Sequence, residues 1–304
     1  MIRTLRSIVD PAALTDVVAD AYRLPVVACV LLRSLVNDVY RVDTGDGPRV
    51  LKLYRAGHRT RAEAAWEVDL SRALGGAVAR GIPLADGAPA GVLAAVEGER
   101  PYTLWEWAPG ARPEPPWDDR LFRRYGAATA RFHAACDAAG VPPRRFDVLD
   151  ALGRPYEEVL DRVAADDRAR IAELVAAARE WLAGRALDTG VCHGDVSLDN
   201  LHVDGDRLVF YDLDRAGAGP RAVDLAGVAA TDGFGAFLGG YRSVRAFGDA
   251  DLAAVPWLGA VDLVGNLHFH LVDKPRLRGT ESWQEGWLDR TLAALRSSAA
   301  TLLR

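Results

Sequence analysis

The chain has 304 residues, of which 50% are hydrophobic and 26% are charged, as in an ordinary soluble globular protein. Its formal charge of -5 and its pI near 5.7 lack the basic excess that is typical of proteins that bind nucleic acid. The longest apolar run, 24–32, is too short to span a bilayer, and the N-terminus does not have the layout of a signal peptide. We therefore expect a cytoplasmic protein without a nucleic-acid or membrane partner.

Only two of the 37 basic residues are lysines, Lys52 and Lys274. A compact ammonium and a planar guanidinium bind different partners, so a lysine in such an arginine-rich chain indicates a position that needs a point charge. For Lys274 the same count is equally consistent with chance. Three cysteines, Cys29, Cys136 and Cys192, stand far apart without a CxxC spacing, so we expect neither a disulfide framework nor a zinc site.

The N-terminal part of the chain is predicted to form strands around a helix. Runs rich in β-branched and apolar residues, separated by turn signals, predict strands at 26–34, 36–43, 49–54, 92–96 and 102–107. The helix is predicted at 60–74, where Thr60 and Glu63 have the spacing of a capping box.

The composition of the sequence changes at residue 108, where a proline-rich stretch begins that runs to Pro116. Beyond this stretch the pattern predicts helices at 117–139 and 156–182 and from 220 to the C-terminus, interrupted by two short strands at 201–204 and 207–212. We therefore expect an α+β fold with two lobes, a β-rich lobe of residues 1–107 and a larger helical lobe of residues 108–304.

One segment of the helical lobe carries the residues of a catalytic site. Residues 192–200 read CHGDVSLDN, so that Asn200 follows Asp195 by five positions, and Asp212 comes twelve positions later at the end of the second short strand. Phosphoryl transfer needs a carboxylate that accepts the proton of the attacking hydroxyl, and hard oxygen ligands that hold Mg²⁺ on the phosphates. This pattern predicts Asp195 as the catalytic base and Asn200 and Asp212 as the metal ligands.

The HGD-x4-N motif, followed by a strand that ends in aspartate, resembles the motifs of the aminoglycoside phosphotransferase and choline kinase families. Protein kinases carry a related motif with arginine at the position of Gly194. The resemblance covers most of the chain and implies a protein-kinase-like fold, ATP and Mg²⁺ as cofactors, and a hydroxyl group as acceptor. Residues 212–214, 219–220 and 224–225 are most similar to a branch that contains bacterial stress-response kinases and homoserine-kinase-like proteins.

The same resemblance implies a nucleotide site in the β-rich lobe. Residues 34–40, SLVNDVY, resemble the nucleotide-binding hairpin, which makes Ser34 and Asn37 nucleotide contacts. Lys52 matches the lysine that binds the α- and β-phosphates. Residues 102–110, YTLWEWAPG, resemble the hinge whose backbone holds adenine, here at Glu106 and Ala108.

The expected partner of Lys52 is one of two glutamates that lie one helical turn apart. Glu63 can close the capping box with Thr60. Glu67 lies deeper in the helix and fits the family pattern better, so Glu67 is favoured.

Other polar residues near the motif receive structural roles. Asp224 is expected to cap a helix and to brace the catalytic loop. Asp214 can either join the metal ligands or form a salt bridge with Arg215 or Arg221, and both alternatives stay open. The histidines are expected to be structural, without a metal, at His133, His193, His202, His268 and His270.

The short interval between Asp212 and Asp224 leaves little room for the regulatory loop of a protein kinase. The leading acceptor is therefore a small molecule, such as an aminoglycoside or other antibiotic, homoserine or a similar compound, bound by a monomer or homodimer. Two alternatives are a stress-response type Ser/Thr protein kinase and a nucleotide-binding pseudokinase that acts as an interaction module. Specificity is expected from the C-terminal helices, at Trp257, Asp262, Asn266, Trp283, Glu285 and Trp287. The sequence leaves open whether ATP or GTP is the donor.

Overall fold

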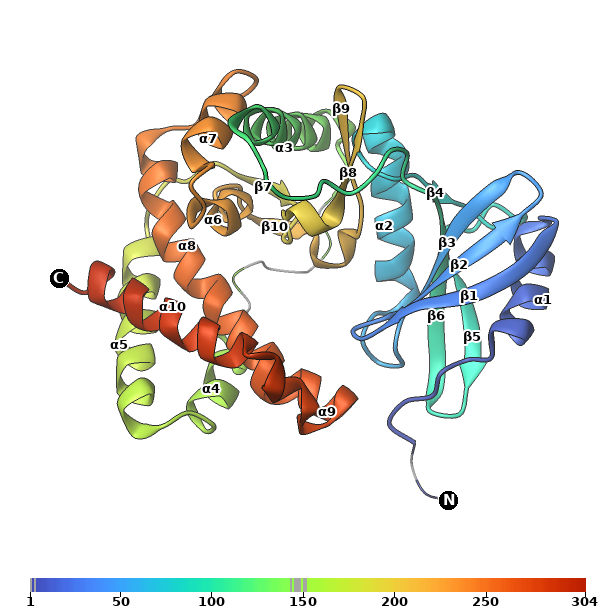
Figure 1. Cartoon of the computed structure of the whole chain (residues 1–304), viewed down its shortest axis with the longest axis horizontal. Coiled ribbons are helices and arrows are strands. Elements are labelled where there is room, and N and C mark those ends of the chain that lie inside the picture. Colours follow the sequence, from blue (N-terminus) through green and yellow to red (C-terminus); the bar gives the residue numbers. More distant parts are fainter. Residues whose placement is uncertain (1, 3, 143, 145–148, 150–151) are drawn as a thin grey trace. The chain divides into compact units, whose positions relative to one another are not determined.

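The computed structural model describes residues 2, 4–142, 144, 149 and 152–304, and the fold is α+β as expected (Figure 1). Backbone contacts divide the chain into two compact units. The first contains residues 1–112 and 201–211, and the second contains residues 113–200 and 212–304. The expected lobes place 201–211 with the helical part, whereas this hairpin packs with the first unit because Val203 pairs with Ala111 and Phe210 with Val78.

The first unit is built on an antiparallel sheet with the strand order β1-β2-β3-β6-β4, and β5 also pairs with β6. The strands span Val26–Ser34 (β1), Asp38–Thr44 (β2), Gly47–Leu53 (β3), Gly81–Ile82 (β4), Gly91–Ala95 (β5) and Gly98–Glu106 (β6). The register pairs Lys52 with Val39 on one side and with Thr103 on the other. Lys52 therefore lies in the interior of the sheet. The added hairpin consists of β8 (Leu201–Asp204) and β9 (Arg207–Phe210).

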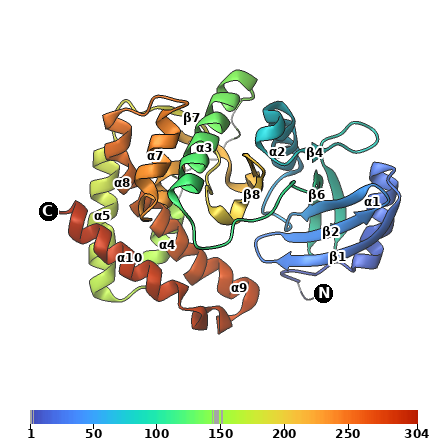
Figure 2. The same ribbon diagram turned by 45° about the horizontal axis from the view of Figure 1, so that its top comes forward.

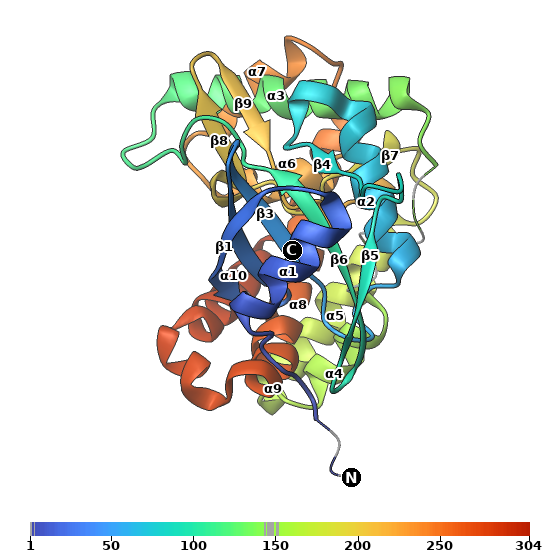
Figure 3. The same ribbon diagram turned by 90° about the vertical axis from the view of Figure 1, so that its right-hand side faces the viewer.

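Two helices pack on this sheet. Helix α1 (Pro11–Tyr22) places Leu14, Val18 and Tyr22 against buried residues of the sheet such as Leu51 and Leu53 (Figure 3). The side chain of Lys52 alternates with these two leucines along β3 and meets helix α2 (Arg61–Leu74) instead. The sheet thus has one apolar face and one face that carries an ionic group.

The second unit is mainly helical (Figure 2). Val159 of α4, Ile171 and Leu174 of α5, Val264 of α8 and Leu295 of α10 belong to its main apolar cluster. The helices span Asp119–Ala139 (α3), Arg154–Leu160 (α4), Ala165–Leu182 (α5), Val223–Ala229 (α6), Phe234–Arg242 (α7), Asp249–His268 (α8), Lys274–Arg278 (α9) and Trp287–Leu302 (α10). Two short strands, β7 (Thr189–Cys192) and β10 (Gly217–Pro220), pair in antiparallel fashion beside these helices.

The helical run 249–278 is long and apolar enough to cross a membrane by length and composition. However, Leu258, Val261, Val264 and Leu267 of this run are buried within the second unit. This burial favours a core helix, which would show the same composition.

Sequence patterns predicted the bounds of β1, β2, β3, β5, β6, β8, β9, α2 and α3 to within a few residues, whereas helices α6 to α10 were predicted only as a helical region without bounds. Helix α1 was missed, although Asp10 caps it, Pro11 starts it, and its apolar residues recur at helical spacing. The single helix predicted at 156–182 is two helices, because the chain turns between Leu160 and Ala165. Strands β7 and β10 were also missed, because four residues carry too little periodicity to be recognised.

Candidate active site

The catalytic loop follows β7 and is shaped by a glycine. Cys192 pairs with Gly217 in the β7–β10 ladder, which brings the residues after Cys192 close to those before Gly217. Gly194 has a φ of +75°, and a Cβ atom there would lie 2.3 Å from the carbonyl oxygen of Arg215. Both the backbone angle and the available space therefore require glycine immediately before Asp195.

Asp224, at the start of α6, holds the catalytic loop in place through hydrogen bonds. The backbone N–H groups of His193 and Gly194 donate to the two carboxylate oxygens of Asp224, at 2.7 and 2.8 Å. Burial alone would raise the pKa of Asp224, but His133, whose Nε2 lies 2.9 Å away, and His193 lower the pKa below its usual range. The predicted bracing role is confirmed. The predicted capping role is wrong, because the side chain of Asp224 makes no cap hydrogen bond in α6.

Asp195 is half-buried in this loop, and burial raises the pKa of its carboxyl group. Arg215 and His193 oppose this rise, whereas the nearby carboxylates of Asp212 and Asp262 add to it. The side-chain nitrogen of Asn200 donates to the backbone carbonyl of Asp195 at 3.1 Å. The amide nitrogen of Asn200 thereby ties the two ends of this segment of the loop together.

Asp212 has a backbone φ of +63°, an unusual conformation for a residue other than glycine. The turn that follows, Leu213–Arg215, is held by the guanidinium of Arg144. This buried group donates to the carbonyls of Leu213 at 3.1 Å, Asp214 and Ala216 at 2.8 Å. One side chain thus binds three carbonyls of the segment that follows Asp212.

A cavity of about 330 Å³ opens beside the catalytic loop, entirely within the second unit. Its polar wall contains Asp195 and the ion pair of Arg215 with Asp262, whose atoms lie 3.1 Å apart. Its apolar wall includes Trp117 and Phe122. The side chain of Asn266, another predicted specificity residue, donates to Asp262 at 3.2 Å.

The ion pair predicted in the first unit is present. The ammonium of Lys52 lies 3.2 Å from Glu67, which also accepts a hydrogen bond of 2.9 Å from the hydroxyl of Tyr54. Glu67 is fully buried. Glu63 instead closes the capping box with Thr60, so the choice of Glu67 is confirmed.

Ser34 is the last residue of β1, and Asn37 lies in the turn between β1 and β2. The hydroxyl of Ser34 donates to Asp38, and the side chain of Asn37 is buried. Asp38 accepts hydrogen bonds from Arg6 at 3.1 Å and from Arg100 at 2.6 Å. These two contacts, which the sequence patterns did not reveal, fix the base of the turn.

The predicted hinge backbone is also held in place. The N–H of Glu106 donates to the carbonyl of Arg80 at 2.8 Å. The ring of His202 lies with its Nδ1 2.9 Å from the carbonyl of Ala108. Contacts of Ser34, Asn37, Glu106 and Ala108 with a nucleotide stay predictions.

His133, His268 and Lys274 have structural partners. His133 lies between Asp224 and the hydroxyl of Tyr241, and His268 lies between Glu158 and Asp273. Lys274 is buried and pairs with Glu285 at 2.5 Å, so neither lysine of the chain is a surface charge. Within the described part of the chain, no group of three or more His, Cys, Asp or Glu side chains could hold a metal ion.

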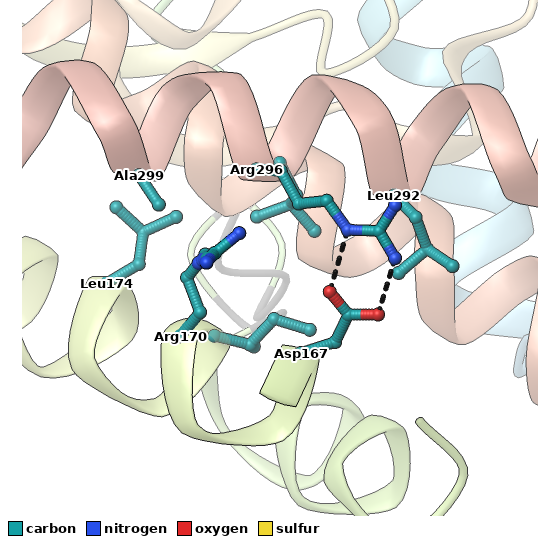
Figure 4. Close-up of a pocket in the computed structure, with 8 residues that line it drawn as sticks. Asp167, Arg170, Leu174, Leu292, Arg296 and Ala299 are labelled. Atoms are coloured by element: carbon teal, nitrogen blue, oxygen red, sulfur yellow. Dashed lines mark hydrogen bonds and ion pairs between the residues drawn. The ribbon is translucent and has the colours of Figure 1, made fainter. Parts of the chain in front are cut away.

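A second cavity, between α5 and α10, is unsuited to a substrate (Figure 4). It has a volume of about 10 Å³. Asp167 and Arg296 line it and bind each other through two hydrogen bonds of 2.8 and 2.7 Å. A space of this size holds about one water molecule.

Comparison with known proteins identifies the family of this chain. The model of the phosphotransferase enzyme family matches residues 30–258, which include Lys52, Asp195, Asn200 and Asp212. The chain belongs to this family. This phosphotransferase is 37% identical over 276 residues to an uncharacterised protein of Deinococcus radiodurans, covering 83% of this chain and 79% of that protein.

Two solved structures share the fold of this phosphotransferase. One is the amicoumacin kinase hAmiN in complex with AMP-PNP, Ca²⁺ and Ami, with a TM-score of 0.74, 19% identity, and coverage of 95% of this chain and 94% of that one. The other is a microcompartment-associated aminopropanol kinase, with a TM-score of 0.76, 20% identity, and coverage of 96% and 97%. At these identities the comparison establishes the protein-kinase-like fold that the motif implied.

Proposed function

We propose that this phosphotransferase is an ATP- and Mg²⁺-dependent kinase that transfers the γ-phosphate to a hydroxyl group of a small molecule. The observation that carries this proposal is the position of Asp195. Its carboxylate lies in a braced loop and lines a cavity large enough for a small acceptor, in a chain whose family transfers phosphate.

In the proposed reaction, Asp195 receives the proton of the acceptor hydroxyl. The oxygen of that hydroxyl forms a bond to the γ-phosphorus as the bond from this phosphorus to the oxygen of the departing ADP breaks. The bracing of the loop by Asp224 supports this role, because a base must be held within hydrogen-bonding distance of the proton that it accepts. Burial raises the pKa of Asp195, and the positive charges of Arg215 and His193 partly counteract this rise.

Asn200 and Asp212 are the proposed ligands of Mg²⁺, which when bound neutralises charge on the phosphates. The donor set fits, since an amide oxygen and a carboxylate are the hard oxygen ligands that this ion prefers. The hydrogen bond from the Asn200 nitrogen to Asp195 supports the assignment, because it leaves the amide oxygen for the metal. Arg144 holds the turn that follows Asp212.

Lys52 is the proposed ligand of the α- and β-phosphates. Its ion pair with the buried Glu67 orients the ammonium. A compact, strongly charged group suits this task in a chain that otherwise uses arginine almost throughout. ATP as the donor is also supported by the AMP-PNP bound to the amicoumacin kinase.

The small-molecule acceptor is supported by the solved structures of the same fold, which are kinases of amicoumacin and of aminopropanol by name. The proposal is tested with γ-labelled ATP, Mg²⁺ and a panel of homoserine, choline, sugars, aminoglycosides, nucleosides and a generic protein. We expect label on one class of small molecule. Label on the protein alone would favour the Ser/Thr kinase alternative. Nucleotide binding without any transfer would favour the pseudokinase.

A further inference from the structure

The cavity beside Asp195 has two unlike walls. The side that is formed by α3 and the segment before it contributes Trp117, Phe122 and Tyr125. Val196 of the catalytic loop and Val228 of α6 continue this apolar surface. Its volume of about 330 Å³ lies within the range of pockets that bind small molecules.

The aromatic residues of the apolar wall are held in place by packing against neighbouring residues. Tyr125 packs edge-on against Phe237, with ring centroids 4.9 Å apart. Phe122 is buried, and a Cβ atom on Gly233 would lie 2.1 Å from its ring, so α7 begins directly behind it. Trp117 is 45% exposed and lies in the segment that precedes α3. A bound molecule therefore meets a preformed apolar surface with one partly exposed indole.

The polar groups gather around the reacting end. Asp195, Asp199 and Asp262 face the cavity together with Arg215. Three carboxylates and one guanidinium leave the cavity with a negative charge, which opposes an acceptor that is itself anionic. The ion pair of Arg215 with Asp262 offers both donors and acceptors to a polar group next to the reacting hydroxyl.

We propose that the acceptor is an amphiphilic alcohol without a negative charge, whose apolar chain or ring lies along the wall formed by Trp117, Phe122, Tyr125, Val196 and Val228. This inference rests on the proposed kinase activity and narrows its substrate class. A polyhydroxylated sugar fits less well, because hydroxyl groups placed against that wall would lose their hydrogen bonds to water.

A homologous series of acceptors tests the inference. ADP release is measured with 2-aminoethanol, 2-amino-1-butanol and 2-amino-1-hexanol, with glucose as the polyhydroxylated comparison. Each methylene buried on the wall should raise kcat/KM about fourfold. A flat or falling series, or a higher kcat/KM for glucose than for 2-amino-1-hexanol, overturns the inference and leaves the kinase activity intact.

The indole of Trp117 supplies the matched variants. Trp117→Ala should flatten the series, chiefly through a higher KM for the longest alcohol, whereas Trp181→Ala should not, since Trp181 is also partly exposed and does not line the cavity. Equal series in both variants contradict the assigned wall. Binding of the same alcohols to Asp195→Asn is measured by calorimetry. If the affinity rises with chain length, the alcohols bind along the apolar wall even though this variant does not turn over. If the affinity does not rise, the inference is refuted. A lack of ADP release from every acceptor with the unaltered protein would instead count against the kinase activity itself.

Discussion

Gly194 shows how a single residue sets the geometry of the catalytic loop. Its φ of +75° and the nearby carbonyl of Arg215 exclude a side chain. Protein kinases have arginine at the equivalent motif position. In this chain, the close approach of the two segments that flank the β7–β10 ladder requires glycine.

We predict that Gly194→Ala lowers kcat by about 10²-fold, because the added methyl group displaces Asp195, and a shift of about 1 Å in a reacting group costs that much. Gly205→Ala is the matched control, since Gly205 also has a positive φ, of +56°, but no atom within 4 Å of the added carbon. Both variants should lose roughly 1–2 kcal/mol of stability from the backbone conformation alone. Equal loss of activity in the two would show that packing against Arg215 is irrelevant.

Arg144 is a second residue whose effect reaches the site through its neighbours. It joins the carbonyls of residues 213, 214 and 216 and so restrains the turn that follows Asp212. We predict that Arg144→Gln lowers stability by about 1–3 kcal/mol, because buried carbonyls lose their donors. The apparent affinity of the variant for Mg²⁺ should also fall, because the turn that follows Asp212 is less restrained.

The measurement for Arg144 is the Mg²⁺ dependence of ADP release, together with direct Mn²⁺ binding in the presence of nucleotide. Arg162→Gln is the control, because Arg162 is exposed and donates to a single carbonyl, that of Glu158. If Arg144→Gln is less stable but binds Mn²⁺ with the same affinity as the unaltered protein, Arg144 has a purely structural role.

At the scale of elements, His268 links the end of α8 to α4 and to the turn before α9. Hydrogen bonds to Asp273 and Glu158 raise the pKa of His268 above its ordinary value of 6.5. A raised pKa in the folded state means that the stabilising contribution is fully present below about pH 6.5 and is lost as the pH rises through the folded-state pKa. The melting temperature of the protein should exceed that of His268→Gln at low pH, and the difference should shrink as the pH rises.

His270 provides a control of opposite sign. Burial and the nearby Lys274 lower the pKa of His270, so folding opposes its protonation and stability is lost as the pH falls. His270→Gln should therefore become more stable relative to the unaltered protein at low pH. Melting temperatures of both variants and of the unaltered protein are measured from pH 5 to 8. A difference between His268→Gln and the unaltered protein that is the same at every pH would contradict the role of His268.

The elements also show what the sequence could predict. Long strands and helices with strong periodicity or clear caps, such as β1 and α2, were predicted closely, because local preferences and burial agree there. The hairpin 201–211 was predicted as strands but assigned to the other lobe, because its pairing with Ala111 and Val78 is a long-range contact. Local pattern carries no information on such contacts.

In the candidate site, too, local sequence motifs could be recognised, whereas long-range contacts could not. Asp195, Asn200, Asp212, Lys52 and Glu67 could be predicted because motif spacing places them; the ion pair of Lys52 with Glu67 is confirmed, and the roles in catalysis and binding stay predictions. Arg144, Arg215 and Arg100 could not, since arginine is common throughout the chain and only the folded structure selects those that meet Leu213, Asp262 and Asp38. Charges that act through long-range partners leave no periodic trace in the sequence.

At the scale of the whole molecule, the candidate residues are divided between two units. Lys52 and Glu67 belong to the first, whereas Asp195, Asn200, Asp212 and the cavity beside Asp195 belong to the second. In the proposed reaction, Lys52 binds the phosphates of ATP and Asp195 accepts the proton of the acceptor. Loss of Lys52 and loss of Asp195 should therefore differ, because the first weakens ATP binding and the second removes proton transfer.

The most direct measurement compares Asp195→Asn with the unaltered protein, recording ADP release from MgATP with the best acceptor and ATP binding by calorimetry. We predict that ATP still binds to the variant, whereas kcat falls by about 10²–10⁴-fold, the usual contribution of a general base. Turnover by Asp195→Asn at the rate of the unaltered protein would contradict the assignment of Asp195 and with it the proposed mechanism.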